Sequence, residues 1–153
     1  MIRRIVVPPL GLLAALLACR AGDAAPAALD PGTETCRSCR MPVSDPSLAA
    51  QLSAPAEEPL FFDEAGCLRD FLRAAPTLPR GTTAFVADHR TGDWVRASLA
   101  VFSRCPSVAT PMGSHLLAHA DAASRDADPA ARACASVSVE ELFGPAGPPD
   151  GGR

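Results

Sequence analysis

The sequence contains no lysine and no tyrosine, and aromatic residues make up only 5% of its 153 positions. All 14 basic side chains are therefore arginines, and the formal net charge is -3. A chain with so few aromatic rings and no surplus of positive charge lacks the means to bind nucleic acid through stacking and phosphate contacts. Its 16 prolines and 11 glycines also exclude a long coiled coil or helical bundle.

The sequence also lacks an apolar run long enough to cross a bilayer as a helix, which needs about 20 residues. Its longest run, residues 5–18, follows Arg3 and Arg4 and ends directly before Cys19. This pattern is typical of a lipoprotein signal peptide, after whose removal a lipidated Cys19 is the N-terminus. An ordinary secretory peptide with a cysteine nearby is the alternative. We expect residues 1–18 to be the signal peptide and residues 19–35 a flexible tether. The protein is then exported and anchored on the periplasmic side of a bacterial membrane, and the lack of Asp after Cys19 favours the outer membrane.

Five cysteines remain beyond Cys19, and an odd number cannot all pair in an oxidising compartment. Cys67 lies on the apolar side of an expected helix, which predicts a buried core thiol. Cys105 and Cys134 could form a disulfide, but the sequence leaves this pairing open.

The spacing of Cys36 and Cys39 is the sharpest local feature. Haem attachment is excluded because Arg40, rather than histidine, follows the second cysteine. A thioredoxin-like redox centre needs this spacing at a helix N-terminus, whereas Met41 and Pro42 begin no obvious helix. A structural zinc site stays open, although the sequence offers no second close pair of cysteine or histidine ligands.

Two methionines favour a fourth chemistry, the binding of a soft metal ion. Met41 lies two residues after Cys39, so an extended segment presents both sulfurs on one side. Met112 lies in a loop between Pro111 and Gly113, where a core methionine is not usually found, although packing in the core is the alternative role for both residues. Thiolate and thioether ligands together select Cu(I).

Several segments resemble the NosL family of copper lipoproteins encoded with nitrous oxide reductase. The resemblance extends from Cys36 to Phe143 and rests mainly on the CxxCxM block and on the Pro-Met-Gly block around Met112. The matching segments are residues 36–46, 49–51, 62–68, 88–95, 110–114 and 116–120.

This resemblance implies a monomeric Cu(I) carrier that supplies copper for the copper-sulfide centre of nitrous oxide reductase. It implies Cys39, Met41 and Met112 as ligands, with Cys36 as a helper. The family usually has glycine where this chain has Arg40, a positive charge that disfavours a bound cation. The competing interpretation is an exported thiol-disulfide oxidoreductase that uses Cys36 and Cys39.

The hydrophobic pattern predicts an α+β fold. Asp63 is a suitable N-cap for a helix with apolar residues at helical spacing, which Pro76 ends. Asp121 caps a second helix, which is interrupted near Pro129, and a short turn follows at residues 140–143. Strands are expected at residues 60–62, 83–87, 99–102, 116–120 and 136–139, with a hairpin turn at residues 89–93 that leads into a short strand at residues 94–95.

We therefore expect one copper-binding domain of two small ββαβ-like units packed together, about residues 36–95 and 96–143. The family resemblance implies the same duplicated arrangement, similar to organomercurial lyase. Residues 144–153 are expected to be a disordered tail.

The remaining polar residues give weaker signals. His115 and His119 are four residues apart and close to Met112, so a nitrogen ligand, or a second metal ion, stays open. His89 is expected to be solvated in a charged turn. No catalytic motif is present, and we expect a binding protein rather than an enzyme.

Overall fold

The computed structural model describes residues 24–151 of the chain, so the expected signal peptide and Cys19 lie outside the described residues. None of the helices in that range is both long and apolar enough to cross a membrane. The elements in chain order are β1 (Ala50–Ser53), β2 (Leu60–Phe62), α1 (Ala65–Arg73), β3 (Thr83–Ala87), β4 (Trp94–Arg96), β5 (Val101–Arg104), β6 (Leu116–His119), α2 (Ala122–Ala127), the 3-10 helix η1 (Pro129–Ala131), β7 (Ala135–Val137) and α3 (Val139–Phe143).

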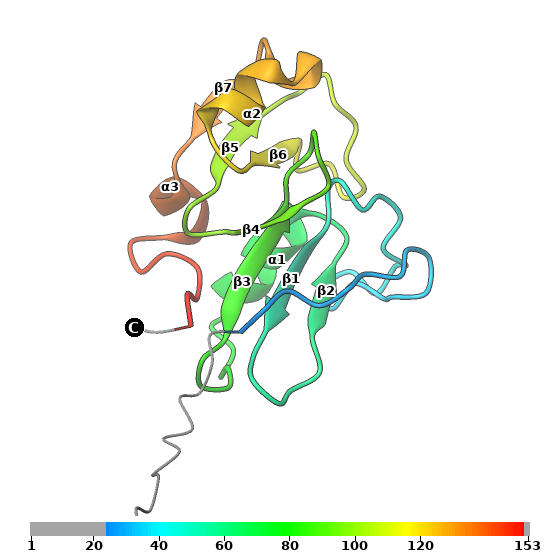
Figure 1. The fold of residues 1–153 in the computed structure, drawn as a ribbon, viewed down its shortest axis with the longest axis vertical. Helices are drawn as coiled ribbons and strands as arrows, with labels where there is room; N and C mark the ends of the chain where they lie inside the picture. Colours follow the sequence, from blue (N-terminus) through cyan, green and yellow to red (C-terminus); the bar gives the residue numbers. More distant parts are fainter. Residues whose placement is uncertain (1–23, 152–153) are drawn as a thin grey trace, which may run out of the picture.

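The described chain forms two small antiparallel sheets, which confirms the α+β class (Figure 1). The first sheet has the order β2-β1-β3-β4 and the second the order β6-β5-β7. In each sheet the first strand in sequence lies between the next two, and a helical segment connects the second strand to the third. Residues 50–87 and 101–137 therefore share one ββαβ topology, to which β4 adds an edge strand.

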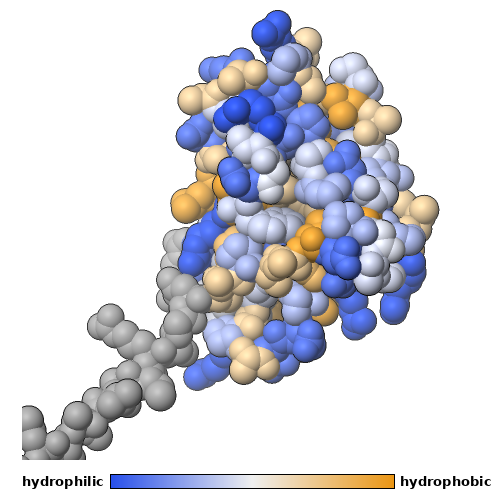
Figure 2. Space-filling view, turned by 45° about the vertical axis from the view of Figure 1, so that its right-hand side comes forward, coloured by the Kyte–Doolittle hydropathy of each residue, from blue (hydrophilic) through white to orange (hydrophobic). Residues whose placement is uncertain are grey.

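One core joins the two sheets. Its largest fully buried members come from both halves of the chain, and α1 contacts β1 and β2 of the first sheet as well as β6 and α3 of the second half. These buried members are Phe62, Leu68, Phe102, Leu116 and Leu142. On the face drawn in Figure 2, apolar side chains form only small, separate patches between polar ones. Burial in this shared core is thus the main force that holds the two units together.

The helix prediction was right about α1 but wrong about its cap. Glu64 is the N-cap, and its side chain makes no capping hydrogen bond. The Asp63 carboxylate instead accepts hydrogen bonds from the backbone N–H of Ser44 (2.8 Å) and from the Ser44 hydroxyl (3.1 Å). Asp63 therefore ties the start of α1 to the segment that follows the cysteine pair. The cap prediction for α2 is confirmed, because the Asp121 side chain accepts from the N–H of Ser124.

Both segments expected to be flexible make ordered contacts where the structure describes them. The backbone of Ala27, in the expected tether, exchanges two hydrogen bonds with the side-chain amide of buried Gln51. In the expected tail, the carbonyl of Pro149 accepts from the N–H of Ala84 at 2.8 Å. The tail finds this partner because β4 pairs with residues 85–87 and Ala97 binds only the carbonyl of Ala84, which leaves the N–H of Ala84 for Pro149.

Asp88 fastens the β3–β4 turn to the second half of the chain. Its Oδ1 accepts from the backbone N–H groups of Arg90 (2.9 Å) and Thr91 (3.1 Å). Its Oδ2 accepts from the N–H of Ala120 (2.7 Å) and the hydroxyl of Ser124 (2.6 Å). Burial alone raises the pKa of Asp88, but these four hydrogen bonds outweigh burial and hold the pKa below its ordinary value of 3.8.

We expect Asp88→Asn to lower the free energy of unfolding at pH 7 by about 1–3 kcal/mol, because the amide cannot accept from both sets of donors. Ser124→Ala, which removes a single donor, should have a smaller effect. Since the folded-state pKa is lowered, the stabilisation is complete above pH 3.8 and is lost as the pH falls through the folded value. The gap between wild type and Asp88→Asn in urea unfolding should therefore narrow in acid. An equal gap at pH 7 and pH 2 would contradict this account.

Candidate metal centre

The Cys36–Cys39 segment is a tight loop held against the first sheet. The N–H of Cys36 donates to the carbonyl of Met41 (2.8 Å), and the N–H of Arg40 donates to the carbonyl of Cys36 (3.0 Å). The N–H of Arg37 donates to the carbonyl of Phe61 (2.8 Å), which anchors the loop to β2. Residues 37–39 form a turn rather than the start of a helix. The loop therefore lacks the helix that supports a thioredoxin-like redox centre.

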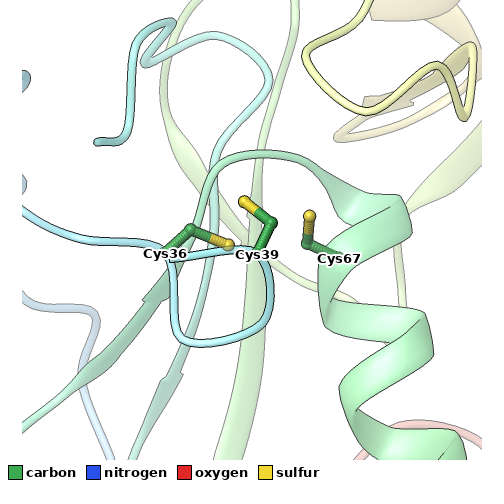
Figure 3. Close-up of side chains that lie close together, drawn as sticks. All are labelled: Cys36, Cys39 and Cys67. Carbon is green, nitrogen blue, oxygen red and sulfur yellow. The ribbon is translucent and has the colours of Figure 1, made fainter. Parts of the chain in front are cut away.

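A third thiol completes a cluster that the sequence analysis did not assemble. Cys67, in the first turn of α1, lies beside Cys36 and Cys39, and the three sulfur atoms are within 4.8 Å of one another (Figure 3). Cys36 and Cys67 are buried, and Cys39 is partly exposed. The prediction that Cys67 is a buried thiol of the core is confirmed, but its sulfur also faces the cysteine pair.

The hydrogen bonds of the cluster lower the pKa of one thiol and raise the pKa of another. The Cys67 thiol donates to the Cys36 sulfur, and this bond is the main cause that lowers the pKa of Cys36 to about 4 against the opposing effect of burial. The N–H groups of Cys39 and Asp63 support the Cys36 thiolate further. The same thiol–thiolate bond raises the pKa of Cys67, and burial raises the pKa of Cys39. The cluster therefore favours ionisation at Cys36 over ionisation at Cys39 or Cys67.

The other two described cysteines, Cys105 and Cys134, form a disulfide, the pairing that the sequence left open. The disulfide accounts for the odd number of cysteines. Two are oxidised and three are free, and the three free thiols are the three that meet.

Met41 and Met112 lie on two loops that adjoin the cluster. The N–H of Met41 donates to the Cys39 sulfur, and the N–H of Met112 donates to Oε2 of buried Glu64 at the N-cap of α1 (3.2 Å). Their side chains are 52% and 53% exposed, so neither fills the core. The backbone of Met41 is thus held at Cys39 and that of Met112 at the N-cap of α1, while both residues are about half exposed.

Gly66 allows the Met112 loop to approach α1 this closely. A Cβ atom at Gly66 would lie 2.5 Å from Cβ of Ser114 and 2.5 Å from Oε1 of Glu64. Contacts this short are strongly repulsive, and the Ser114 atom is close to the backbone and cannot move aside freely. Only glycine fits between α1 and the 110–115 loop.

Arg40 occupies a conformation that favours glycine. Its φ of 68° lies in the left-handed region, where any residue that has a Cβ atom is destabilised by about 1–2 kcal/mol relative to glycine. The residue completes the turn that returns the chain from Cys36 to Met41. Its side chain is exposed and points a positive charge out of the loop that carries two of the thiols.

The histidines do not join this cluster. The ring of His115 contacts the carbonyl of Val108 through Nδ1 (2.8 Å), within its own loop. His119 is fully buried at the end of β6 and contacts Asp128. The prediction that His89 is solvated is wrong, because its Nδ1 also contacts Asp128, at 2.6 Å. The sequence could not show this, since residues 89, 119 and 128 belong to separate elements.

Comparison of the chain with protein-family models, curated proteins and solved structures finds no match. The resemblance to copper lipoproteins therefore stays a prediction from the sequence.

We expect Gly66→Ala to lower the free energy of unfolding by about 1–3 kcal/mol, because the new methyl group forces α1 and the 110–115 loop apart. Adding Ser114→Gly removes the nearest obstacle, so the double variant should recover part of the loss in urea unfolding. If the changes in unfolding free energy caused by the two substitutions were strictly additive, the contact between Gly66 and Ser114 would not determine how closely α1 and the 110–115 loop pack.

We expect Arg40→Gly to raise the free energy of unfolding by about 0.5–1 kcal/mol, because relief of the left-handed strain exceeds the entropy cost of a new glycine. Arg37→Gly is the matched control, since Arg37 is an exposed arginine in the same loop without a positive φ. It should be neutral or destabilising in the same urea experiment. Equal effects of the two substitutions would disprove the backbone explanation.

Proposed function

We propose that this chain is an exported, lipid-anchored Cu(I) metallochaperone that delivers copper for assembly of the copper-sulfide centre of nitrous oxide reductase. The observation that supports it best is the cluster of Cys36, Cys39 and Cys67, with the exposed Met41 and Met112 on adjoining loops. Cu(I) is the cargo of this site rather than a resident cofactor.

The donor set favours Cu(I) over other metals. Three sulfurs that converge without a carboxylate or imidazole suit a soft, polarisable ion, and Cu(I) is stable with three ligands. A structural zinc site takes four ligands, so this cluster would need a further one. The Cys36 thiolate is ready to bind a cation, while Cys39 and Cys67 lose their protons as the metal enters.

The gradient of exposure suits transfer of the cargo. Cys36 and Cys67 are buried, Cys39 is partly exposed, and the two thioethers are about half exposed. A copper ion can therefore meet the methionines first and the thiols afterwards, and a ligand of the partner protein can attack from the same side. The buried end of the cluster protects the ion from solvent.

The same gradient argues against the redox alternative. A thiol-disulfide oxidoreductase needs an accessible cysteine of low pKa as its nucleophile. In this cluster the cysteine whose pKa is lowered, Cys36, is fully buried, and burial raises the pKa of the more exposed Cys39. The reactive sulfur and the accessible sulfur are different atoms.

The destination of the copper rests on the resemblance between residues 36–143 and the NosL family. So do the periplasmic location, the lipid on Cys19 and the finer likeness to the organomercurial-lyase fold. The repeated ββαβ topology supports a duplicated unit of that kind. The family resemblance implies Cys39, Met41 and Met112 as ligands. This proposal adds Cys67 and treats Cys36 as a direct ligand rather than a helper.

An anaerobic Cu(I) titration of the full-length chain in detergent, against a competing chelator, tests the proposal. We expect one tightly bound Cu(I), with an affinity that falls by at least ~10-fold in Cys67→Ser and also falls in Met112→Ala, because each loses a sulfur donor. Leu99→Ala is the control for Met112→Ala, since Leu99 is an exposed apolar side chain as well (72%).

Weak Cu(I) binding that is indifferent to Cys67 and Met112 would contradict the proposal. If the same protein readily cycled between a Cys36–Cys39 disulfide and dithiol with a protein substrate, the redox function would replace it.

A further inference from the structure

A second group of metal-ligating side chains meets where the β3–β4 turn lies against β6. His89 comes from the turn, His119 from the end of β6, and Asp128 from the residue between α2 and η1. Nδ1 of His89 lies 2.6 Å and Nε2 of His119 lies 2.9 Å from the same atom, Oδ2 of Asp128. The three ligand atoms are within 4.8 Å of one another. Three separate segments therefore bring one potential donor each to the same place, where both ring nitrogens face Oδ2 of Asp128.

The backbone around this group holds the donors in place. The N–H of His89 donates to the carbonyl of Ala118 (2.8 Å), which joins the turn to β6 directly. Oδ1 of Asp128 accepts from the N–H of Ala130 (2.9 Å), so Oδ2 is turned toward both imidazoles. His119 pairs with Val101 in the second sheet. The donors are thus ordered before any ligand arrives.

This arrangement is costly for a purely structural element. The side chain of His119 is fully buried, and its Nδ1 has no hydrogen-bond partner among the residues that the structure describes. The Asp128 side chain is 6% exposed and directs one oxygen at two imidazoles. An unsatisfied buried polar atom destabilises a fold, and an apolar ring would fill the same space without that cost. Since an apolar residue would avoid this cost, His119 is retained for its Nε2, which faces Asp128, and the unsatisfied Nδ1 lies on the other side of the ring.

We propose that His89, His119 and Asp128 form a binding site for a borderline divalent transition ion such as Zn(II) or Cu(II). Two imidazole nitrogens and one carboxylate oxygen are the donor set that such ions prefer, and three protein ligands leave one position open for water or an exchanging ligand. In a tetrahedral site with bonds of about 2.0 Å, neighbouring ligand atoms lie about 3.3 Å apart. The observed separations of 2.6 Å and 2.9 Å from Asp128 must widen by about 0.7 Å and about 0.4 Å to reach that geometry.

The site is accessible and chemically distinct from the thiol cluster. The side chain of His89 is 19% exposed, so an ion can enter from the side of the turn while His119 and Asp128 close the interior. Nitrogen and oxygen donors select against Cu(I), for which the three sulfurs compete far better. This inference is therefore independent of the proposed function, since either site can exist without the other.

Titration of the reduced full-length chain with Zn(II) against a chromophoric chelator tests the proposal. We expect two equivalents to bind, one at the thiols and one at this site. His89→Gln and Asp128→Asn should each lower the affinity of one equivalent by at least ~100-fold, because each removes a direct ligand. His115→Gln is the matched control, because His115 is a partly buried loop histidine outside the group. Circular dichroism of each variant verifies folding. If Asp128→Asn does not fold, the result for His89→Gln, at the more exposed position, tests the proposal.

Co(II) then assigns the two equivalents. The equivalent lost in His89→Gln should show only d–d absorption, whereas the other should show sulfur-to-cobalt charge transfer and disappear in Cys67→Ser. If the wild-type chain binds a single equivalent that depends on the thiols, or if a second equivalent survives His89→Gln in the folded protein, the group is a hydrogen-bond network and the proposal is wrong. Loss of the sulfur-bound equivalent alone would count against the thiol site and leave this one standing.

Discussion

The close approach of α1 to the 110–115 loop is the constraint on which the rest of the structure depends. It places the first turn of a helix from one ββαβ unit against a loop from the other, at the point where Gly66 faces Ser114. The N-terminus of α1 carries Cys67, and the N–H of Met112 donates to Glu64 at its N-cap. Without this contact the two units could still share an apolar core, but the Met112 loop would no longer be held against the N-cap of the helix that carries Cys67.

The cysteine loop reaches the same point by a different route. Its anchor on Phe61 lies in β2, and the clamp between Ser44 and Asp63 lies in the short connection from β2 into α1. The position of Cys36 relative to Cys67 is therefore fixed by hydrogen bonds to the residues that directly precede α1. Such bonds are kept only if the surrounding chain is ordered, which explains why the segment expected to be a loose tether is folded against Gln51. The site needs its N-terminal approach to be rigid.

The sequence predicted what local rules govern and missed what distant partners decide. The strands at residues 60–62 and 83–87 match β2 and β3, the hairpin into β4 is confirmed, and Asp121 caps α2. The strand expected at residues 99–102 begins two residues early. β1 was not predicted: its four residues alternate between apolar and polar side chains only briefly, and the fold buries all four, Gln51 and Ser53 included. Asp63 fits the pattern of an N-cap as well as any residue, but Ser44, nineteen positions away, takes its carboxylate. The order of the tail depends in the same way on an N–H of β3 that β4 does not bind.

In the candidate site, too, the sequence indicates the chemistry of the donors, whereas only the fold shows which of them come together. Sulfur chemistry and the CxxCxM spacing favour a soft metal, and both methionines are exposed, Met41 next to the cysteine loop and Met112 in a loop bound to the N-cap of α1. Cys67, by contrast, satisfies every local criterion of a core residue, and only the fold shows that its sulfur faces Cys36. The free thiols lie in the Cys36–Cys39 loop and at the start of α1, whereas His89 and His119 lie in the β3–β4 turn and at the end of β6. If both proposals hold, one small domain would offer Cu(I) a sulfur site and a borderline ion a separate site of nitrogen and oxygen donors.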